Sequence, residues 1–381
     1  MNFELNEEQL MVKSSVREFA DNEIATRARE YDEAEKFPKE QIEGLAELGI
    51  LGMIIPEEYG GAGFDTVSYA VALEEIARAD ASVAVIVSVT NSVCCYPILS
   101  FGTEEQKQKF LVPLAKGEKL GAFCLTEPQA GSDATNLKTR AVEDGDFYII
   151  NGTKSWVTNG GFSDVHIVMA VTGENNGKKE ITAFIAEKET EGLAVSSIEH
   201  KMGQRASQTT ELSFTDARVP KANVLGKLGD GMRIAFSSLD NGRIGIASLS
   251  VGVAQAALEE AQKYSKDRIA FGKPIAEHQA IQFKIADMAT NTEAARLLTL
   301  RAAAMKDSGH RQTGIFSAQA KLFASENANR VCAEAIQIHG GNGYSRHYNV
   351  EKYYRDARIT TIYEGTSEMQ RIIIARGILK D

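Results

Sequence analysis

Apolar residues recur with a helical period in both end regions of this chain. Near the C-terminus, Val251, Ala254 and Leu258 would share one face of a helix. Closer to the N-terminus, residues 39–48 and 67–80 show the same period. Both regions are therefore predicted to be helical, and long helices joined by short loops are typical of bundles.

Between these regions the pattern changes to short apolar or alternating segments, at 147–150, 165–170 and 181–185. Turn-forming clusters such as residues 143–146 separate them, which predicts a small antiparallel β domain. The fold class is α+β and mostly α. The expected domains are an N-terminal helical domain (1–120), a middle antiparallel β domain (121–228) and a C-terminal helical domain (229–381).

One apolar run, residues 83–99, contains three adjacent polar residues, Thr90, Asn91 and Ser92. Polar groups inside a buried helix either bond to the local backbone or face a cavity. The sequence leaves both alternatives open.

Composition places the chain among ordinary globular proteins, with 43% hydrophobic and 25% charged residues in 381. A formal charge of -10 argues against nucleic acid or an anionic membrane as a partner. We recognise neither a secretory leader nor a run of about 18 apolar residues, so we expect neither secretion nor a membrane span.

The metal-binding residue types are scattered. None of the cysteines has metal-ligand spacing, and the six histidines do not cluster. We expect no metal site, reduced thiols and a cytoplasmic location. The cysteines are Cys94, Cys95, Cys124 and Cys332.

The most chemically suggestive stretch lies near the C-terminus, where Glu364 and Gly365 precede Thr366, Ser367 and Glu368. Glycine permits close approach of a ligand, and the N–H groups that begin the next helix favour an anion or a carbonyl oxygen. Glu364 would then be a general base at the edge of a binding site. The alternative is a capped helix start, with Thr366 or Ser367 as N-cap and Glu364 in solvent.

A second candidate is the segment 123–133, which contains Pro128, Gly131 and Ser132 and could be a turn or a polar ledge for a heterocycle. Trp156 is the only tryptophan of the chain and precedes Val157 and Thr158. A single tryptophan is more often a core residue than a ligand contact.

Anion sites are suggested by Arg243, by Arg268 and by the glycine-containing segment 337–341. A Rossmann dinucleotide site is not indicated, because the glycine-rich loop 56–63 lacks the required spacing.

Four of these segments, at 126–133, 267–272, 337–341 and 362–368, occur in the order and spacing of one family. The chain resembles the acyl-CoA dehydrogenase flavoproteins, most closely the short-chain, butyryl-CoA type, over residues 5–379. The resemblance implies FAD as cofactor, a homotetramer, and a C-terminal four-helix bundle after the helical and β domains.

The resemblance also implies roles for individual residues. The flavin ring would contact Phe123, Leu125, Thr126, Gly131, Ser132, Trp156, Val157 and Thr158. The FAD of a neighbouring subunit would contact Arg268, Phe271, Gln279, Gln337, Ile338, Gly340 and Gly341, and the subunit's own FAD would contact Thr366 and Glu368. The acyl-CoA substrate would contact Asn91, Ser132, Phe236, Asp240, Arg243, Tyr363 and Gly365.

In such enzymes the thioester carbonyl is hydrogen-bonded by the N–H of the residue matching Glu364 and by a flavin ribityl hydroxyl. Glu364 would take the α proton while the β hydrogen leaves as hydride to flavin N5, giving a trans-2-enoyl-CoA. The resemblance implies an electron-transferring flavoprotein as the electron acceptor.

Two positions narrow the substrate. Relatives for long or branched chains can carry the base at the position of Gly242, and glutaryl-CoA dehydrogenases carry an arginine near Ala84. Both features are missing, which favours Glu364 as base and a short, uncharged acyl group. An alicyclic or branched acyl-CoA stays open as substrate, as does a flavin oxidase or an acyl-CoA-binding protein of the same fold.

Overall fold

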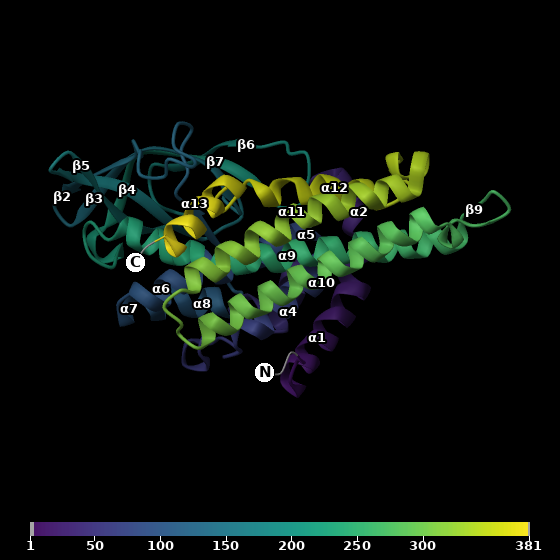
Figure 1. The fold of residues 1–381 in the computed structure, drawn as a ribbon. Helices are drawn as coiled ribbons and strands as arrows, with labels where there is room; N and C mark the ends of the chain where they lie inside the picture. Colours follow the sequence, from purple (N-terminus) through teal and green to yellow (C-terminus); the bar gives the residue numbers. More distant parts are fainter. Residues whose placement is uncertain (1–3, 380–381) are drawn as a thin grey trace.

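The computed structural model describes residues 4–379, which form an elongated molecule with long helices running along its length (Figure 1). A β-sheet occupies one end, and a small hairpin projects at the opposite end. The predicted succession of helical, β and helical regions is confirmed.

The N-terminal region is helical and begins at a capping box. The Asn6 side chain accepts a hydrogen bond of 2.8 Å from the Gln9 N–H, and the Gln9 side chain accepts one of 3.0 Å from the Asn6 N–H. Short 3₁₀ and π-helical segments carry the label η. The elements are α1 (Glu7–Phe19), η1 (Ala20–Ala25), α2 (Ala28–Ala34), α3 (Lys39–Glu47), η2 (Ile50–Gly52), η3 (Glu57–Tyr59), α4 (Thr66–Ala79), α5 (Ala81–Val89), η4 (Thr90–Cys95), α6 (Tyr96–Phe101), α7 (Glu104–Gln106), η5 (Lys107–Leu111) and α8 (Val112–Ala115).

The run α5–η4–α6 forms one apolar helical segment, Ala81–Phe101, that is long and apolar enough to cross a membrane, with a mean hydropathy of 1.7. The expectation that no such run exists was wrong. Burial accounts for its composition, since 89% of its most apolar window lies inside the fold, as in a core helix.

The middle region is an eight-stranded sheet in the order β6-β7-β3-β2-β4-β5-β8, with β1 beside β4. Most pairings are antiparallel, as predicted, but β1 and β2 both run parallel to β4, so the sheet is mixed. The elements are β1 (Gly121–Cys124), β2 (Arg140–Asp144), β3 (Phe147–Thr158), β4 (Val165–Asn175), β5 (Lys178–Glu187), β6 (Leu193–Ile198), β7 (Thr209–Pro220), η6 (Lys221–Asn223) and β8 (Val224–Leu225).

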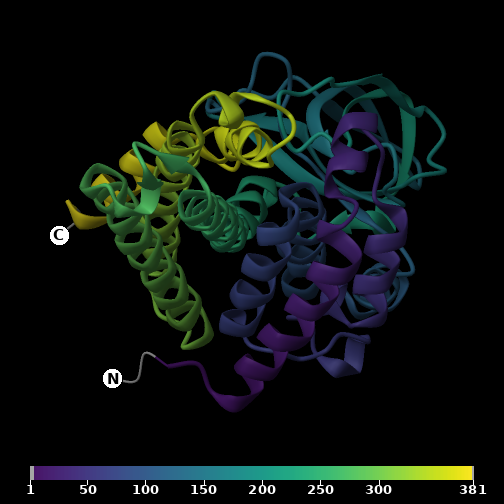
Figure 2. The ribbon, with the colours of Figure 1, turned by 90° about the vertical axis from the view of Figure 1, so that its right-hand side faces the viewer.

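The C-terminal region is built on α9, a helix of 37 residues. Figure 2 looks down this helix, with the N-terminal helices on one side and the other C-terminal helices on the opposite side. The elements are α9 (Gly231–Asp267), β9 (Ile269–Ala270), β10 (Lys273–Pro274), η7 (Ile275–Glu277), α10 (Gln279–Asp307), α11 (Thr313–His339), η8 (Gly340–Tyr344), α12 (Val350–Arg358), η9 (Ile359–Thr361) and α13 (Ser367–Ile378).

The reason for the central place of α9 is its composition. Small residues such as Gly245 and Gly252 let it approach α5 and α4 closely, and a β-carbon at Gly252 would lie 2.3 Å from the Glu74 carbonyl oxygen. One face of α9 therefore completes the N-terminal core, while the opposite side packs against α10 and α11.

Candidate active site

Glu364 lies in the short loop between η9 and α13, in an unusual backbone conformation. Its φ is 52° and that of Gly365 is 91°, so two successive residues are left-handed. For a residue other than glycine this conformation costs about 1–3 kcal/mol and persists only where the surroundings fix it. Thr366 then caps α13 by accepting a hydrogen bond from the Met369 N–H.

Two side chains hold this loop from behind. The Gln370 amide donates to the carbonyl oxygens of Glu364 (3.2 Å) and Gly365 (2.8 Å), and the Lys321 ammonium donates to the Gly365 oxygen (2.8 Å). No hydrogen bond from the Glu364 N–H is found within residues 4–379, so this donor is available to a ligand.

The carboxylate of Glu364 faces the interior. Its Oε2 atom is fully buried and has no hydrogen-bond partner within the described chain. Burial raises the pKa of Glu364 to about 7, and the positive charges of Lys321 and Arg243 oppose that rise. The alternative of a capped helix start with a solvated Glu364 is thus half right: Thr366 is the N-cap, but the carboxylate is not solvated.

On α9, Phe236, Asp240 and Arg243 follow one helix face that leads towards Glu364. Phe236 is 47% exposed, whereas Arg243 is buried and forms an ion pair with Asp240. The Nε of Arg243 has no partner within residues 4–379. On this side, therefore, Glu364 faces a buried guanidinium that is paired with Asp240 and still lowers the pKa of Glu364.

The predicted ledge is fixed to β3 by a buried ion pair. Lys154 donates to the Leu125 carbonyl oxygen (3.1 Å) and to the Glu127 carboxylate (2.7 Å), and the Ser155 N–H donates to Thr126 (2.9 Å). Burial alone would raise the pKa of Glu127, but Lys154 and backbone donors hold it at about 2. The remaining surface is open, because a β-carbon at Gly131 would have nothing within 4 Å.

Trp156 is not a core residue. A β-bulge between Lys154 and Val157 gives it a φ of 59° and leaves it 58% exposed. The general expectation that a single tryptophan is a core residue does not hold here, and Trp156 stays a predicted flavin contact. Leu125 and Val157 beside the ledge are buried. Thr158 ends β3, and Ser132 is exposed on the ledge.

Asn91 does not face a site. Its amide donates to the carbonyl oxygens of Ile50 (2.9 Å) and Val87 (3.1 Å), and its oxygen accepts from the Met53 N–H (3.2 Å). The neighbouring hydroxyls also bond within the helix. Hydrogen bonds within the helix and, for Asn91, to the η2 segment and the residue after it account for these polar residues. The Asn91 amide is thus engaged within the fold, which does not favour the expected substrate contact.

The candidates for a neighbouring subunit's cofactor lie at the far end of α9. At about 1.5 Å per residue, Arg268 is roughly 37 Å from Arg243 along the helix axis. Phe271, at the tip of the projecting β9–β10 hairpin, is 96% exposed (Figure 1). Four other predicted cofactor contacts are exposed at this same end of α9, far from Glu364: Gln279, Gln337, Gly340 and Gly341. Ile338 is buried and offers only its backbone.

Three residues near Glu364 were not predicted from the sequence as part of the site: Lys321, Gln370 and Gln204. Gln204 donates to the Tyr363 hydroxyl (3.1 Å), so it links the β region to the candidate catalytic loop. A usable signal existed for Lys321, which lies among Ser317, Ala324 and other small residues on the buried face of α11. A lysine in that register is unusual.

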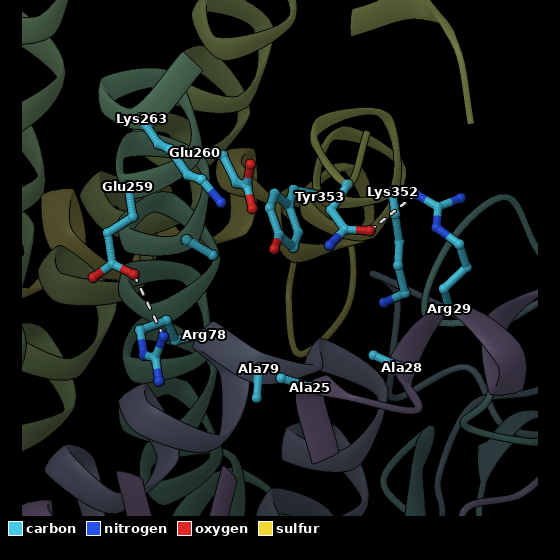
Figure 3. A pocket seen from close by; sticks show the side chains of 12 residues that line it. Ala25, Ala28, Arg29, Arg78, Ala79, Glu259, Glu260, Lys263, Lys352 and Tyr353 are labelled. Carbon is cyan, nitrogen blue, oxygen red and sulfur yellow. Dashed lines mark hydrogen bonds and ion pairs between the residues drawn. The ribbon is translucent and has the colours of Figure 1, made fainter. Parts of the chain in front are cut away.

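Another cavity lies away from Glu364 (Figure 3). It measures about 330 Å³ and separates α9 from α2, α4 and α12. Its charges are mostly paired, as in Arg78 with Glu259 (3.4 Å) and Arg29 with Glu351 (3.4 Å). We therefore place it outside the candidate active site.

The similarity to known proteins extends over nearly the whole chain. Three family models match: acyl-CoA dehydrogenase, N-terminal domain (residues 6–118), middle domain (122–217) and C-terminal domain (229–379). A short-chain-specific acyl-CoA dehydrogenase of Clostridium acetobutylicum is 46% identical over 380 residues, which cover 100% of both chains.

Two solved structures are similar over 100% of both chains, each with a TM-score of 0.98 and 46% identity. One is the butyryl-CoA dehydrogenase of Megasphaera elsdenii. The other belongs to a study of the electron transferring flavoprotein of Acidaminococcus fermentans and of flavin-based electron bifurcation.

Proposed function

Because the chain belongs to the acyl-CoA dehydrogenase family, we propose that it oxidises a short-chain acyl-CoA, such as butyryl-CoA, to the trans-2-enoyl-CoA with Glu364 as the base. The observation that carries this proposal is the buried Oε2 of Glu364, which has no partner within residues 4–379. A carboxylate kept free in a water-excluded position is suited to accept a proton from carbon.

The residues present fit FAD. The open ledge at Gly131, the exposed Trp156 beside it and the exposed Phe271 and Gly341 at the other end leave apolar and backbone surface uncovered. The ledge around Gly131 and the side chain of Trp156 would hold the flavin ring. Thr366 and Glu368 would contact the same FAD, which is bound by their own subunit. When bound, FAD supplies the acceptor of the β hydrogen, which leaves as hydride to N5.

The protein's own groups account for the proton. The free N–H of Glu364 can donate to the thioester carbonyl oxygen, which makes the α C–H more acidic. A pKa of about 7 for Glu364 reduces the difference between the pKa of the base and the much higher pKa of the α C–H group. The left-handed loop is held by Gln370, so the N–H and the carboxylate of Glu364 keep a fixed orientation before the substrate binds.

A short pocket is supported by the packing of α9 one turn beyond Gly242. A β-carbon at Gly245 would lie 2.3 Å from the Ser88 Oγ and 2.9 Å from the Tyr69 hydroxyl. These groups would form the floor for the acyl chain. Phe236, Asp240 and Arg243 would line the entry of the CoA portion.

The partners are part of the same proposal. We propose an electron-transferring flavoprotein as acceptor, a homotetramer in which Arg268 reaches the neighbour's FAD, a cytoplasmic location, and domain limits at residues 120 and 228. The match to a structure from work on such a flavoprotein supports the choice of acceptor.

An anaerobic titration with a panel of acyl-CoAs tests the proposal. Bleaching of the flavin by butyryl-CoA is the expected result. A stronger response to cyclohexanecarboxyl-CoA would favour the alicyclic alternative. Rapid reoxidation of the reduced flavin by air would indicate an oxidase. No bleaching with any acyl-CoA would indicate a binding protein.

A further inference from the structure

Lys321 is a buried charge beside the proposed base. Its side chain is fully buried on α11, and its ammonium donates a hydrogen bond of 2.8 Å to the Gly365 carbonyl oxygen. No carboxylate of residues 4–379 forms an ion pair with it. Burying an ammonium without such a partner is costly, so its presence calls for a compensating role.

The loop does not need Lys321 for support alone. Gln370, a neutral donor, already bonds the same Gly365 oxygen at 2.8 Å and the Glu364 oxygen at 3.2 Å. What Lys321 adds to this arrangement is a positive charge.

Other groups facing Glu364 do not supply an equivalent charge. On α9, the guanidinium of Arg243 also lowers the pKa of Glu364, but less than Lys321 does, and it is paired with Asp240. On α4 and in the loop itself, burial raises the pKa of Tyr69 and Tyr363, which keeps both neutral. Within residues 4–379, Glu368, exposed on α13, and Glu326, paired with Arg371, act on Lys321 rather than on Glu364.

We propose that Lys321 is a positioning residue that keeps Glu364 ionised at neutral pH and fixes the Glu364–Gly365 turn. Burial lowers the pKa of Lys321 to about 8, with Glu364 opposing, so the ammonium persists near pH 7. The inference rests on the proposed function, since it concerns the base of that reaction.

The test is the pH dependence of anaerobic flavin reduction by butyryl-CoA, between about pH 5.5 and 9.5. Lys321→Gln keeps a hydrogen-bond donor and removes the charge. It should move the acid limb of the profile, the part where the rate falls as the pH is lowered, to higher pH by roughly one unit or more. At pH 6.5 the rate should then fall about tenfold, while the rate at high pH changes only a few-fold. Lys321→Arg, which keeps the charge, should leave the limb in place.

Gln370→Met is the matched control, because it removes a neutral donor to the same oxygen. It should lower the rate at every pH without moving the acid limb. An unchanged limb in Lys321→Gln, or an equal shift in Gln370→Met, would overturn the inference. If Lys321→Gln does not fold, Lys321→Met carries the same expectation.

Failure of the proposed function would look different. The wild-type protein would then show no reduction by butyryl-CoA, or Glu364→Gln would be reduced as fast as wild type.

Discussion

The carboxylate of Glu364 lies directly against Gly242 of α9, where a β-carbon would come within 2.2 Å of Oε2. Gly242 is also the position at which relatives for longer or branched chains would carry their base. The two possible base positions therefore occupy the same space, and a glycine at residue 242 leaves that space to Glu364.

Gly242→Ala should accordingly displace the carboxylate. The expected result is a rate of flavin reduction lowered by on the order of tenfold to a hundredfold, because a small misplacement of a base has effects of that size. Thermal stability should change little, since alanine is the better helix former. Ser248→Ala, which removes a hydroxyl bonded within the same helix, is the control and should leave the rate unchanged. Equal rates in wild type and Gly242→Ala would refute this contact.

The raised pKa of Glu364 also predicts a pH-dependent stability. Between about pH 4.5 and 7 the folded state binds more protons at this group than the unfolded state, so stability falls as pH rises through this range. Glu364→Gln removes that effect and should melt at a higher temperature than wild type at pH 8. The difference, on the order of 3 kcal/mol, should vanish below about pH 4.5. A variant less stable than wild type at pH 8 would argue against burial of the charge.

Arg268→Ala should couple loss of flavin to loss of assembly, because the exposed end of α9 is proposed to meet the neighbour's cofactor. Flavin content and sedimentation of the same preparation provide the measurement. Lys266→Ala, an exposed neighbour on α9, is the control. Full flavin content with an unchanged oligomer would show that Arg268 has no such role.

The proposed pocket floor at Ser88 and Tyr69 predicts a sharp chain-length optimum. Each methylene that fits contributes roughly 0.8 kcal/mol, whereas one forced against a packed floor costs about 1–3 kcal/mol. Butyryl-CoA should have a kcat/KM about tenfold or more above that of octanoyl-CoA. A profile that rises from four to eight carbons would contradict the short pocket.

Local features of this protein could be predicted from sequence. The capping box of Asn6 and Gln9 and the N-cap of Thr366 depend on residues three apart, and both are present. The helical regions follow from periodicity, which a buried face imposes.

Features that depend on distant segments could not be predicted. The exposure of Trp156 arises from a register shift between β3 and β7, and the parallel pairing of β1 depends on β4. The surroundings of Glu364 come from α9 and α11, so the sequence around Glu364 shows neither the contact with Gly242 nor the bond from Lys321. The only signal was the lysine itself, on the buried face of α11.

Glu364→Gln tests the central claim most directly, through the rate at which butyryl-CoA reduces the flavin without oxygen. The variant should fold, bind flavin and bind acyl-CoA, because the amide has the shape of the carboxylate. Its reduction should be slower by several powers of ten, while Glu105→Gln, at an exposed carboxylate, should match wild type. Reduction of Glu364→Gln at a rate near that of wild type would mean that another group takes the α proton and that Glu364 is not the base.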